Sequence, residues 1–334
     1  MTRRYRGSYI TANPPTPAGP YQDSAAGGVW SMAYQAQYRQ AGLWPIAGNV
    51  LDGTLAIFAL GFICGSRSVT RNKYTYSGDV VSSATAATTS SGYGAAAGNS
   101  TRGIFALGCT GSFSTTRNKY TYVGDVVASA TSSNAVSYAG SVAGNSTIGI
   151  FALGLDNCGS PATTSNKYTY SSDTNASATA FTAASYAGSA AGNSTFGIFS
   201  LGNAGTTRNK YTYSGCVVSA ATSATNPEFE ASAAGNSTIG IFARGSRQVT
   251  RNRYTYAGDT VAAGGAASTA SARGSAAGNS TVGIFALGMN SSFVSITTRD
   301  KYTYAGCVVS AGGAATAASY GGSAASNGIV GVTL

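Results

Sequence analysis

The sequence lacks histidine altogether and contains only two glutamates, Glu228 and Glu230. Without histidine the chain cannot form a Ser/His/Asp relay. It also has no G-x-x-x-x-G-K-[ST] phosphate loop, and charged residues make up only 9% of its 334 residues. We therefore predict that the protein is not an enzyme, that it has no catalytic residues and that it needs no cofactor.

The two glutamates leave one catalytic alternative, because glycosidases use a pair of carboxylates about 5 to 10 Å apart. In an extended segment NPEFEAS, Glu228 and Glu230 would face the same side of the chain. No third group nearby in the sequence would shift the pKa of either carboxyl. We interpret the pair as a local departure in one repeat at an exposed edge.

Cysteine and long apolar runs are also scarce. Five cysteines, an odd number without a Cys-x-x-Cys pair, predict neither a disulfide framework nor a metal site. No apolar run approaches the roughly 18 residues that span a bilayer. The N-terminal letters MTRRYRGSYITANPP are not followed by the apolar stretch of a signal peptide. We expect synthesis in the cytoplasm without membrane insertion.

The chain is basic, with 20 lysines and arginines against 10 acidic residues and a formal charge of +10. Such a charge attracts anionic partners, but nucleic-acid binding usually gathers its cations into one patch. Here most of the cations belong to a repeated phrase, TRNKYTY from Thr70 and its copies. They would be spread around the molecule, so we do not expect nucleic-acid binding.

The phrase recurs six times, and its spacing is regular. From the second tyrosine of KYTY to the asparagine of the next Gly-Asn pair, the distance is 23 residues in every copy, as from Tyr76 to Asn99. The length varies only between FALG and the next copy of the phrase. A rigid unit with one variable connection is typical of loops carried on a repeated scaffold.

The sequence of each unit predicts four short strands. A segment ending in SAA meets the string STIGIFALG, as from Ser146, in a hairpin whose turn is the Gly-Asn pair. NKYTY forms the third strand, and DVVSSAT, as from Asp79, forms the fourth. Four strands in roughly 45 residues are the size of a propeller blade. The predicted fold is an all-β propeller over residues 48–334, and a β-solenoid is the alternative.

The number of blades follows from counting the strands. Six copies of the third and fourth strands accompany seven candidates for the first two, from Asn49 to Asn327. We therefore predict six blades closed by C-terminal strands. Seven is the alternative if residues 1–47 donate the missing pair.

Residues 1–47 do not share the repeat. After a linker, PPTPAGP, the letters GVWSMAYQAQYRQAGLWP predict a helix at about 31–41, capped by Ser31 and ended by Gly42. Trp30, Tyr34 and Tyr38 would form one aromatic stripe on it. The helix either folds against the propeller or attaches the protein to another subunit.

Two recurring polar features have structural explanations. Asp79, Asp125, Asp173 and Asp259 occupy one turn position, where Cys216 and Cys307 stand in the other copies. Because those cysteines break the pattern, we predict a turn and not a ring of metal ligands. The phrase NST, as at Asn145, matches a glycosylation sequon, but its place after glycine fits a hairpin turn better.

The repeat also supports a resemblance. GNSTIGIFALG from Gly144, followed by a loop, NKYTY and a turn, resembles the kelch-type, galactose-oxidase-like repeats in structural proteins of tailed bacteriophages. GVWSMAYQAQYRQAGLWP resembles a Trp-containing segment of phage tail-fibre and related virion proteins. The units depart from kelch repeats because they lack a consistent double glycine after the second strand and a tryptophan in the fourth. The resemblance implies a virion component, more in the tail or host-adsorption apparatus than on the capsid.

These features lead to a prediction of function. We expect a non-enzymatic virion protein, oligomeric with itself, that binds other virion proteins through residues 1–47 and presents its variable loops to a partner or host-surface glycan. Phe62, Phe113 and Phe293 in those loops, with Trp30, Tyr34 and Tyr38, are the candidate contacts. The alternatives are a capsid decoration protein and a glycan-binding or glycan-cleaving adsorption protein.

Overall fold

A computed structural model describes residues 53–152 and 154–328. In this part of the chain the fold is all-β, with seven antiparallel sheets and only three short 3-10 turns: η1 (Ser77–Asp79), η2 (Ser214–Cys216) and η3 (Ala305–Cys307). None of its helices could cross a membrane. The helix predicted at 31–41, with Trp30, Tyr34 and Tyr38, lies outside the described residues.

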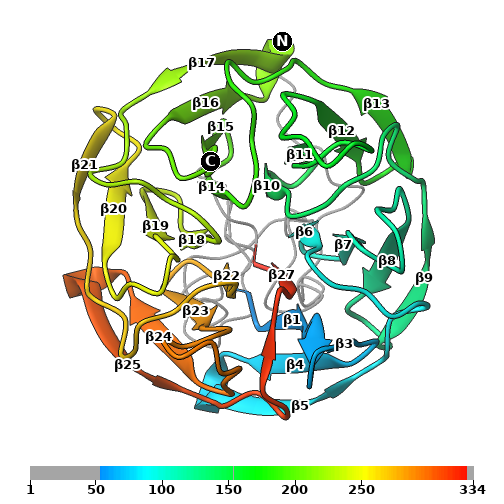
Figure 1. The fold of residues 1–334 in the computed structure, drawn as a ribbon, viewed down its shortest axis with the longest axis vertical. Coiled ribbons are helices and arrows are strands. Elements are labelled where there is room, and N and C mark those ends of the chain that lie inside the picture. Colours follow the sequence, from blue (N-terminus) through cyan, green and yellow to red (C-terminus); the bar gives the residue numbers. More distant parts are fainter. Residues whose placement is uncertain (1–52, 153, 329–334) are drawn as a thin grey trace, which may run out of the picture. The chain divides into compact units, whose positions relative to one another are not determined.

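Six of the sheets have four strands, and we number them along the chain. In each of them the strands follow one another from the centre of Figure 1 outward. Sheet 1 is β27 (Ser323–Ser326), β1 (Leu55–Ala59), β4 (Arg71–Thr75) and β5 (Val80–Ala84). Sheet 2 is β6 (Ala95–Gly98), β7 (Arg102–Ala106), β8 (Arg117–Thr121) and β9 (Val126–Ala130). Sheet 3 is β10 (Ser141–Gly144), β11 (Ile148–Ala152), β12 (Ser165–Thr169) and β13 (Thr174–Ser177).

The remaining sheets repeat the same order. Sheet 4 is β14 (Ser189–Gly192), β15 (Phe196–Ser200), β16 (Arg208–Thr212) and β17 (Val217–Ala221). Sheet 5 is β18 (Ser232–Gly235), β19 (Ile239–Ala243), β20 (Arg251–Thr255) and β21 (Thr260–Ala263). Sheet 6 is β22 (Ser275–Gly278), β23 (Val282–Ala286), β24 (Arg299–Thr303) and β25 (Val308–Gly312). The seventh sheet has three strands: β26 (Ser319–Tyr320), β2 (Phe62–Ile63) and β3 (Ser66–Arg67).

The six four-stranded sheets are arranged around a central axis like the blades of a propeller (Figure 1). Strand β27 pairs with β1, so sheet 1 joins segments that lie far apart in the sequence. Each innermost strand packs against the innermost strands of the two neighbouring sheets, including β27 against both β6 and β22. The all-β, propeller-like part of the prediction is confirmed, and the antiparallel ladders are not those of a parallel β-helix.

The repeated letters account for the packing between sheets. Small residues such as Ala97 and Ala325 form the innermost strands and let neighbouring sheets approach closely. The second strand buries an Ile-Phe pair, and the third buries its first tyrosine, as with Ile104, Phe105 and Tyr120 at 0% exposure. Side chains of adjacent sheets share one apolar cluster; Phe105 and Tyr120, for example, pack with Ile57 of sheet 1.

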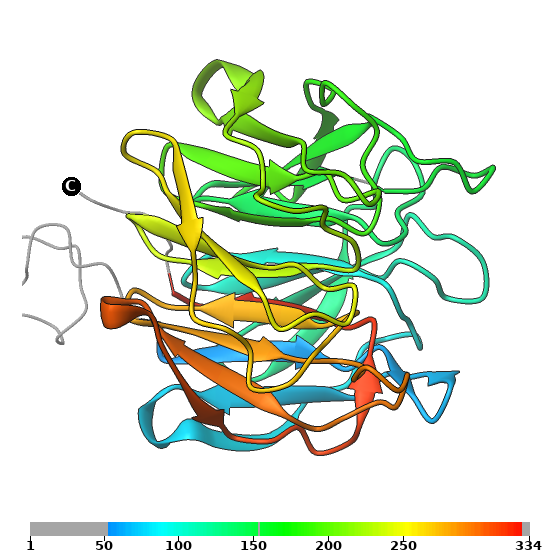
Figure 2. The same ribbon diagram turned by 60° about the vertical axis from the view of Figure 1, so that its left-hand side comes forward.

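The loops separate into two faces, which are seen at the two ends of the strands in Figure 2. We call the end that carries the connections between second and third strands, such as 107–116, the loop face. The other end, which carries the hairpins between first and second strands, such as 99–101, is the hairpin face. The connections of variable length therefore lie on one face, and the regular hairpins lie on the other.

Candidate functional site

The arginines of the repeated phrase lie between the sheets. Arg71, Arg117, Arg208, Arg251 and Arg299 are at most 2% exposed. Each guanidinium lies over a phenylalanine of the next sheet, with 4.6 Å from Arg71 to the Phe105 ring centroid and 4.5 Å from Arg299 to that of Phe58. Burial lowers the pKa of Arg71 to about 10. These cations stabilise the packing and are not accessible to an anionic partner, although they count toward the formal charge.

The two glutamates do not form a pair. The prediction that they face the same side assumed an extended segment, but Glu230 has a φ of 56°. Glu228 is fully buried and accepts a hydrogen bond of 2.6 Å from Nη2 of Arg208. Glu230 instead forms an ion pair of 2.6 Å with Nε of Arg273 near the axis. Two separate arginines therefore hold the two carboxylates, and the assignment of Glu228 to an exposed edge is wrong.

The repeated aspartates connect neighbouring sheets on the hairpin face. Asp79 accepts hydrogen bonds of 2.6 Å from the Tyr74 hydroxyl and 2.8 Å from Lys301 of sheet 6. Burial acts to raise the pKa of the Asp79 carboxyl, but the bonds from Lys301 and Tyr74 outweigh it and lower the pKa. Within the described residues, no three His, Cys, Asp or Glu side chains lie close enough to hold a metal ion.

The candidate binding site lies on the axis at the loop face. Two residues before the innermost strand of each four-stranded sheet, the backbone is left-handed: Tyr93, Ala139, Ala187, Glu230, Arg273 and Gly321. Backbone hydrogen bonds connect these residues around the axis; Tyr93 N–H donates to Gly321 at 2.6 Å, and Ala139 N–H donates to Tyr93 at 2.9 Å. The same kind of bond continues around the axis to Gly321. At one step the donor is Ala231 N–H, the residue after Glu230, and it donates to Ala187 C=O. The scaffold thereby fixes six residues around one opening, and five of them carry a side chain.

These positions carry side chains of different chemistry, so the opening is not symmetric. A cavity of about 120 Å³ is lined there by Tyr93, Tyr138, Tyr186, Glu230 and Arg273. The guanidinium of Arg273 lies 5.7 Å from the ring centroid of Tyr93 and 5.8 Å from that of Tyr320. The side chains of the Arg273–Glu230 pair are 30% and 11% exposed. The opening therefore offers one oriented ion pair among aromatic rings.

Half-buried aromatic rings from several loops continue around this opening. We call Phe62, Tyr93, Phe113, Tyr138 and Tyr320 the aromatic collar. Phe62 stacks on Tyr320 with 5.1 Å between ring centroids and contacts Tyr93 at 5.3 Å. Tyr138 joins the set at 4.9 Å from Tyr93 and 4.6 Å from Phe113. Two of the predicted contact residues, Phe62 and Phe113, thus belong to one aromatic surface.

The third predicted phenylalanine lies apart from the collar. Phe293 is 60% exposed, and the guanidinium of Arg247 lies 4.0 Å from its ring centroid. Tyr93, Tyr138, Arg273 and the axial position of Glu230 were not predicted from the sequence. One feature of the sequence could have indicated this site. The position two residues before the innermost strand varies from Tyr to Ala, Ala, Glu, Arg and Gly in six otherwise similar units.

Electrostatics keep the collar neutral and the ion pair charged. Burial raises the pKa of Tyr138 to about 12 and raises that of Tyr93 well above its usual value. Burial alone would lower the pKa of Arg273, but the hydrogen bond to Glu230 and the nearby tyrosines raise it overall. Neutral rings beside one fixed ion pair are suited to holding a ligand.

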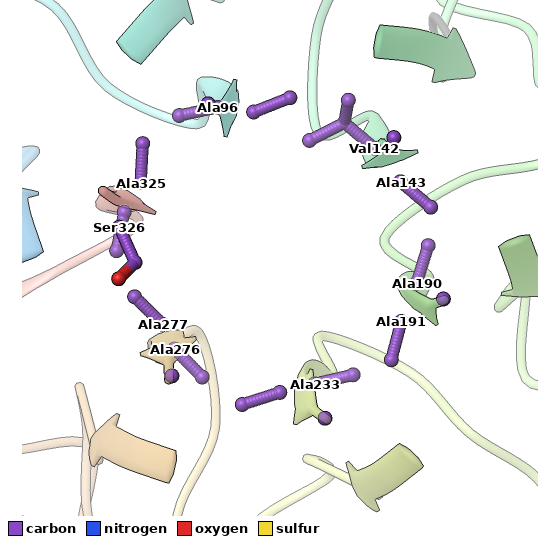
Figure 3. Close-up of a pocket in the computed structure, with 18 of the residues that line it drawn as sticks. Ala96, Val142, Ala143, Ala190, Ala191, Ala233, Ala276, Ala277, Ala325 and Ser326 are labelled. Carbon is purple, nitrogen blue, oxygen red and sulfur yellow. The ribbon is translucent and has the colours of Figure 1, made fainter. Parts of the chain in front are cut away.

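Behind the opening, small side chains line the central channel. Figure 3 shows alanines such as Ala96, Ala190 and Ala233, together with Val142 and Ser326, directed toward its interior. This cavity of about 110 Å³ has no titratable side chain in its lining. The charged and aromatic side chains around the axis therefore lie at the loop face and not in the channel.

No family model and no curated protein matches this chain. The assignment of function therefore rests on the residues and their geometry.

Proposed function

We propose that the protein is a non-enzymatic virion protein of a tailed phage, in the tail or tail-fibre adsorption apparatus, and that it binds its partner with the aromatic collar. The collar carries the proposal, because it places clustered rings and the Arg273–Glu230 pair at one half-buried opening. The isoleucine, phenylalanine and tyrosine residues that recur in every repeat are buried in the packing between sheets, so they are not available to a partner. Aromatic surfaces with a few oriented polar groups are typical of ligand and glycan sites.

The proposal includes a closed propeller of six blades. The strands β26, β2 and β3 extend sheet 1 at the loop face, and isolated bridges stand at the same place in other units, as between Gly92, Cys109 and Phe113. The three-stranded sheet is then an outgrowth of the first blade. The circle of backbone bonds from Tyr93 to Gly321 supports closure by β27.

The location is tested by labelling whole phage particles with antibodies against the protein. We expect the label on the tail. Label on the capsid would favour the decoration protein instead, and absence of the protein from purified particles would end the virion assignment.

The collar is tested by the double substitution Tyr93→Ala and Phe113→Ala. It removes two rings of the collar, so we expect at least tenfold weaker adsorption of particles to host cells, or weaker binding of the isolated protein to host envelopes. Val123→Ala is the control, because Val123 is 85% exposed in a turn of the hairpin face. Unchanged adsorption by a folded double variant would contradict the assignment of the collar.

A further inference from the structure

A third cavity lies on the hairpin face, far along the strands from the collar. It measures about 570 Å³ and opens between sheet 3 and sheet 4. Its lining combines one lysine with a group of hydroxyl side chains: Lys167, Thr147, Ser194, Thr195, Thr212 and Ser214. Ile148 adds an apolar surface. A cavity of roughly 300 to 1,000 Å³ is the usual size of a small-molecule site.

The lysine at this position of the repeat normally faces an aspartate of the next sheet. Lys119 pairs with Asp173 at 2.6 Å, and Lys301 pairs with Asp79 at 2.8 Å. Two further lysines act on the aspartate of the next sheet at longer range, since Lys73 contributes to the lowered pKa of Asp125 and Lys210 to that of Asp259. In these four copies a carboxylate compensates the ammonium group.

The copy at the cavity differs. Cys216 of sheet 4 stands where the aspartate would face Lys167, and Lys167 has no ion pair within the described residues. The other cysteine copy does not leave a free ammonium group, because Arg253 stands in place of the lysine and contacts Cys307 Sγ at 3.5 Å. Among the repeat lysines that the structure describes, Lys167 is thus the one without a carboxylate, and it borders the cavity.

We propose that this cavity binds a saccharide bearing one anionic group, with the ammonium group of Lys167 pairing with that anion. The hydroxyls of Ser194, Thr212 and Ser214 supply donors and acceptors for the ring hydroxyls of the sugar. Those of Thr147 and Thr195 already donate within their own turns and supply acceptors, and Ile148 supplies an apolar contact. A charge-assisted hydrogen bond is about twice as strong as a neutral one, so the anionic group contributes much of the selectivity. The cavity and the collar lie on different faces, so this binding holds whether or not the collar binds a host.

Three probes of matched shape test the proposal in the full chain: glucuronate, glucose 6-phosphate and glucose. Binding is measured by titration calorimetry at low ionic strength, where charge pairing is least screened. We expect at least one of the two anions to bind tenfold or more tightly than glucose. The comparison between them shows whether the site prefers a carboxylate or a phosphate. Equal affinity for all three probes, or no binding of either anion, would overturn the proposal.

Two variants tie the binding to this cavity. Lys167→Met removes the ammonium group, and Cys216→Asp restores the carboxylate found in four other copies, at a left-handed position that those aspartates already occupy. Both should reduce the affinity for the anion at least tenfold while glucose binding stays as it was. Lys73→Met, at the same strand position in sheet 1, should bind like the natural chain. Anion binding that survives both cavity variants would also overturn the proposal.

Discussion

At the residue scale, the six units can be compared as natural variants of one another, because the same position carries different residues in different units. At five of the six contacts between neighbouring four-stranded sheets, an arginine of the third strand lies over a phenylalanine of the next sheet; the contact from sheet 6 to sheet 1 is one of the five. At the sixth interface Ser165 replaces the arginine, and Phe181 covers the ring of Phe199 at 4.7 Å between centroids. In the next unit, which has the arginine, the smaller Ala224 stands at the position of Phe181. A small residue at one position is therefore matched by a large one at the other.

This compensation predicts the effect of exchanging the pair. Phe181→Ala should lower the free energy of unfolding by about 3–5 kcal/mol, because it leaves a cavity against Phe199. Adding Ser165→Arg to that variant should recover about 2 kcal/mol, since the guanidinium can stack on Phe199 as its counterparts do. Denaturant unfolding measures both. A double variant no more stable than Phe181→Ala alone would show that the two positions do not compensate.

At the element scale, the repeated hairpins were predicted correctly as pairs of strands, but their turns were misplaced. The prediction put Gly-Asn at the tip, whereas Asn236 N–H bonds to Ile239 C=O and leaves Ser237 and Thr238 as the two tip residues. The Asn236 Oδ1 accepts from both backbone and hydroxyl of Thr238. Its Nδ2 donates to Ser280 C=O of the next sheet at 3.1 Å. The side chain thus serves two sheets, which local turn preferences do not reveal.

The two roles of this asparagine predict unequal effects within one turn. Asn236→Ala should lower the free energy of unfolding by about 2–3 kcal/mol, because backbone groups in two sheets lose their partner. Thr238→Val removes only one exposed hydroxyl bond and should cost less than about 1 kcal/mol. Thermal and denaturant unfolding of both variants make the comparison. Equal losses would mean that the contact with the next sheet contributes nothing.

At the scale of the whole molecule, the sequence predicts the regular part of the fold and misses the site. The fixed spacing between tyrosine and asparagine, with alternating letters such as NKYTY, was enough to predict four short strands per unit. The opening on the axis assembles Tyr93, Glu230 and Arg273 from three separate sheets. No local pattern marks these residues as neighbours, and only their common position in the repeat relates them. Phe62 and Phe113 were found only because they lie in the loops whose length varies.

The buried tyrosines give the molecule a predicted pH dependence. Burial raises the pKa of the second tyrosine above its usual value in five of the six phrases: Tyr122, Tyr170, Tyr213, Tyr256 and Tyr304. An unfolded tyrosine ionises near pH 10, so above that pH the folded chain holds more protons than the unfolded one, and stability falls as the pH rises. The lowered pKa of Arg71, Arg117 and Arg299 acts in the opposite direction, but the raised tyrosines outnumber these arginines.

Denaturant unfolding at about pH 8, 9, 10 and 11 measures this dependence. We expect constant stability up to about pH 9 and a steady decline above it. Tyr122→Phe is the matched variant, because its hydroxyl has no hydrogen-bond partner within the described residues and its removal deletes one ionisable group. A shallower decline is expected for that variant. If the free energy of unfolding stays constant or increases up to about pH 11, the buried tyrosines do not control the pH dependence of stability.

The pairing of β27 with β1 also has a consequence for biosynthesis. Leu55 and Asn327 bond to each other across an interval of 272 residues. While the ribosome is still translating that interval, β1 has no partner on its inner side, and the nascent first blade remains incomplete. A bare strand edge readily pairs with another chain. Growing polypeptides on neighbouring ribosomes of one messenger are therefore exposed to exchange of this strand until each has made its own.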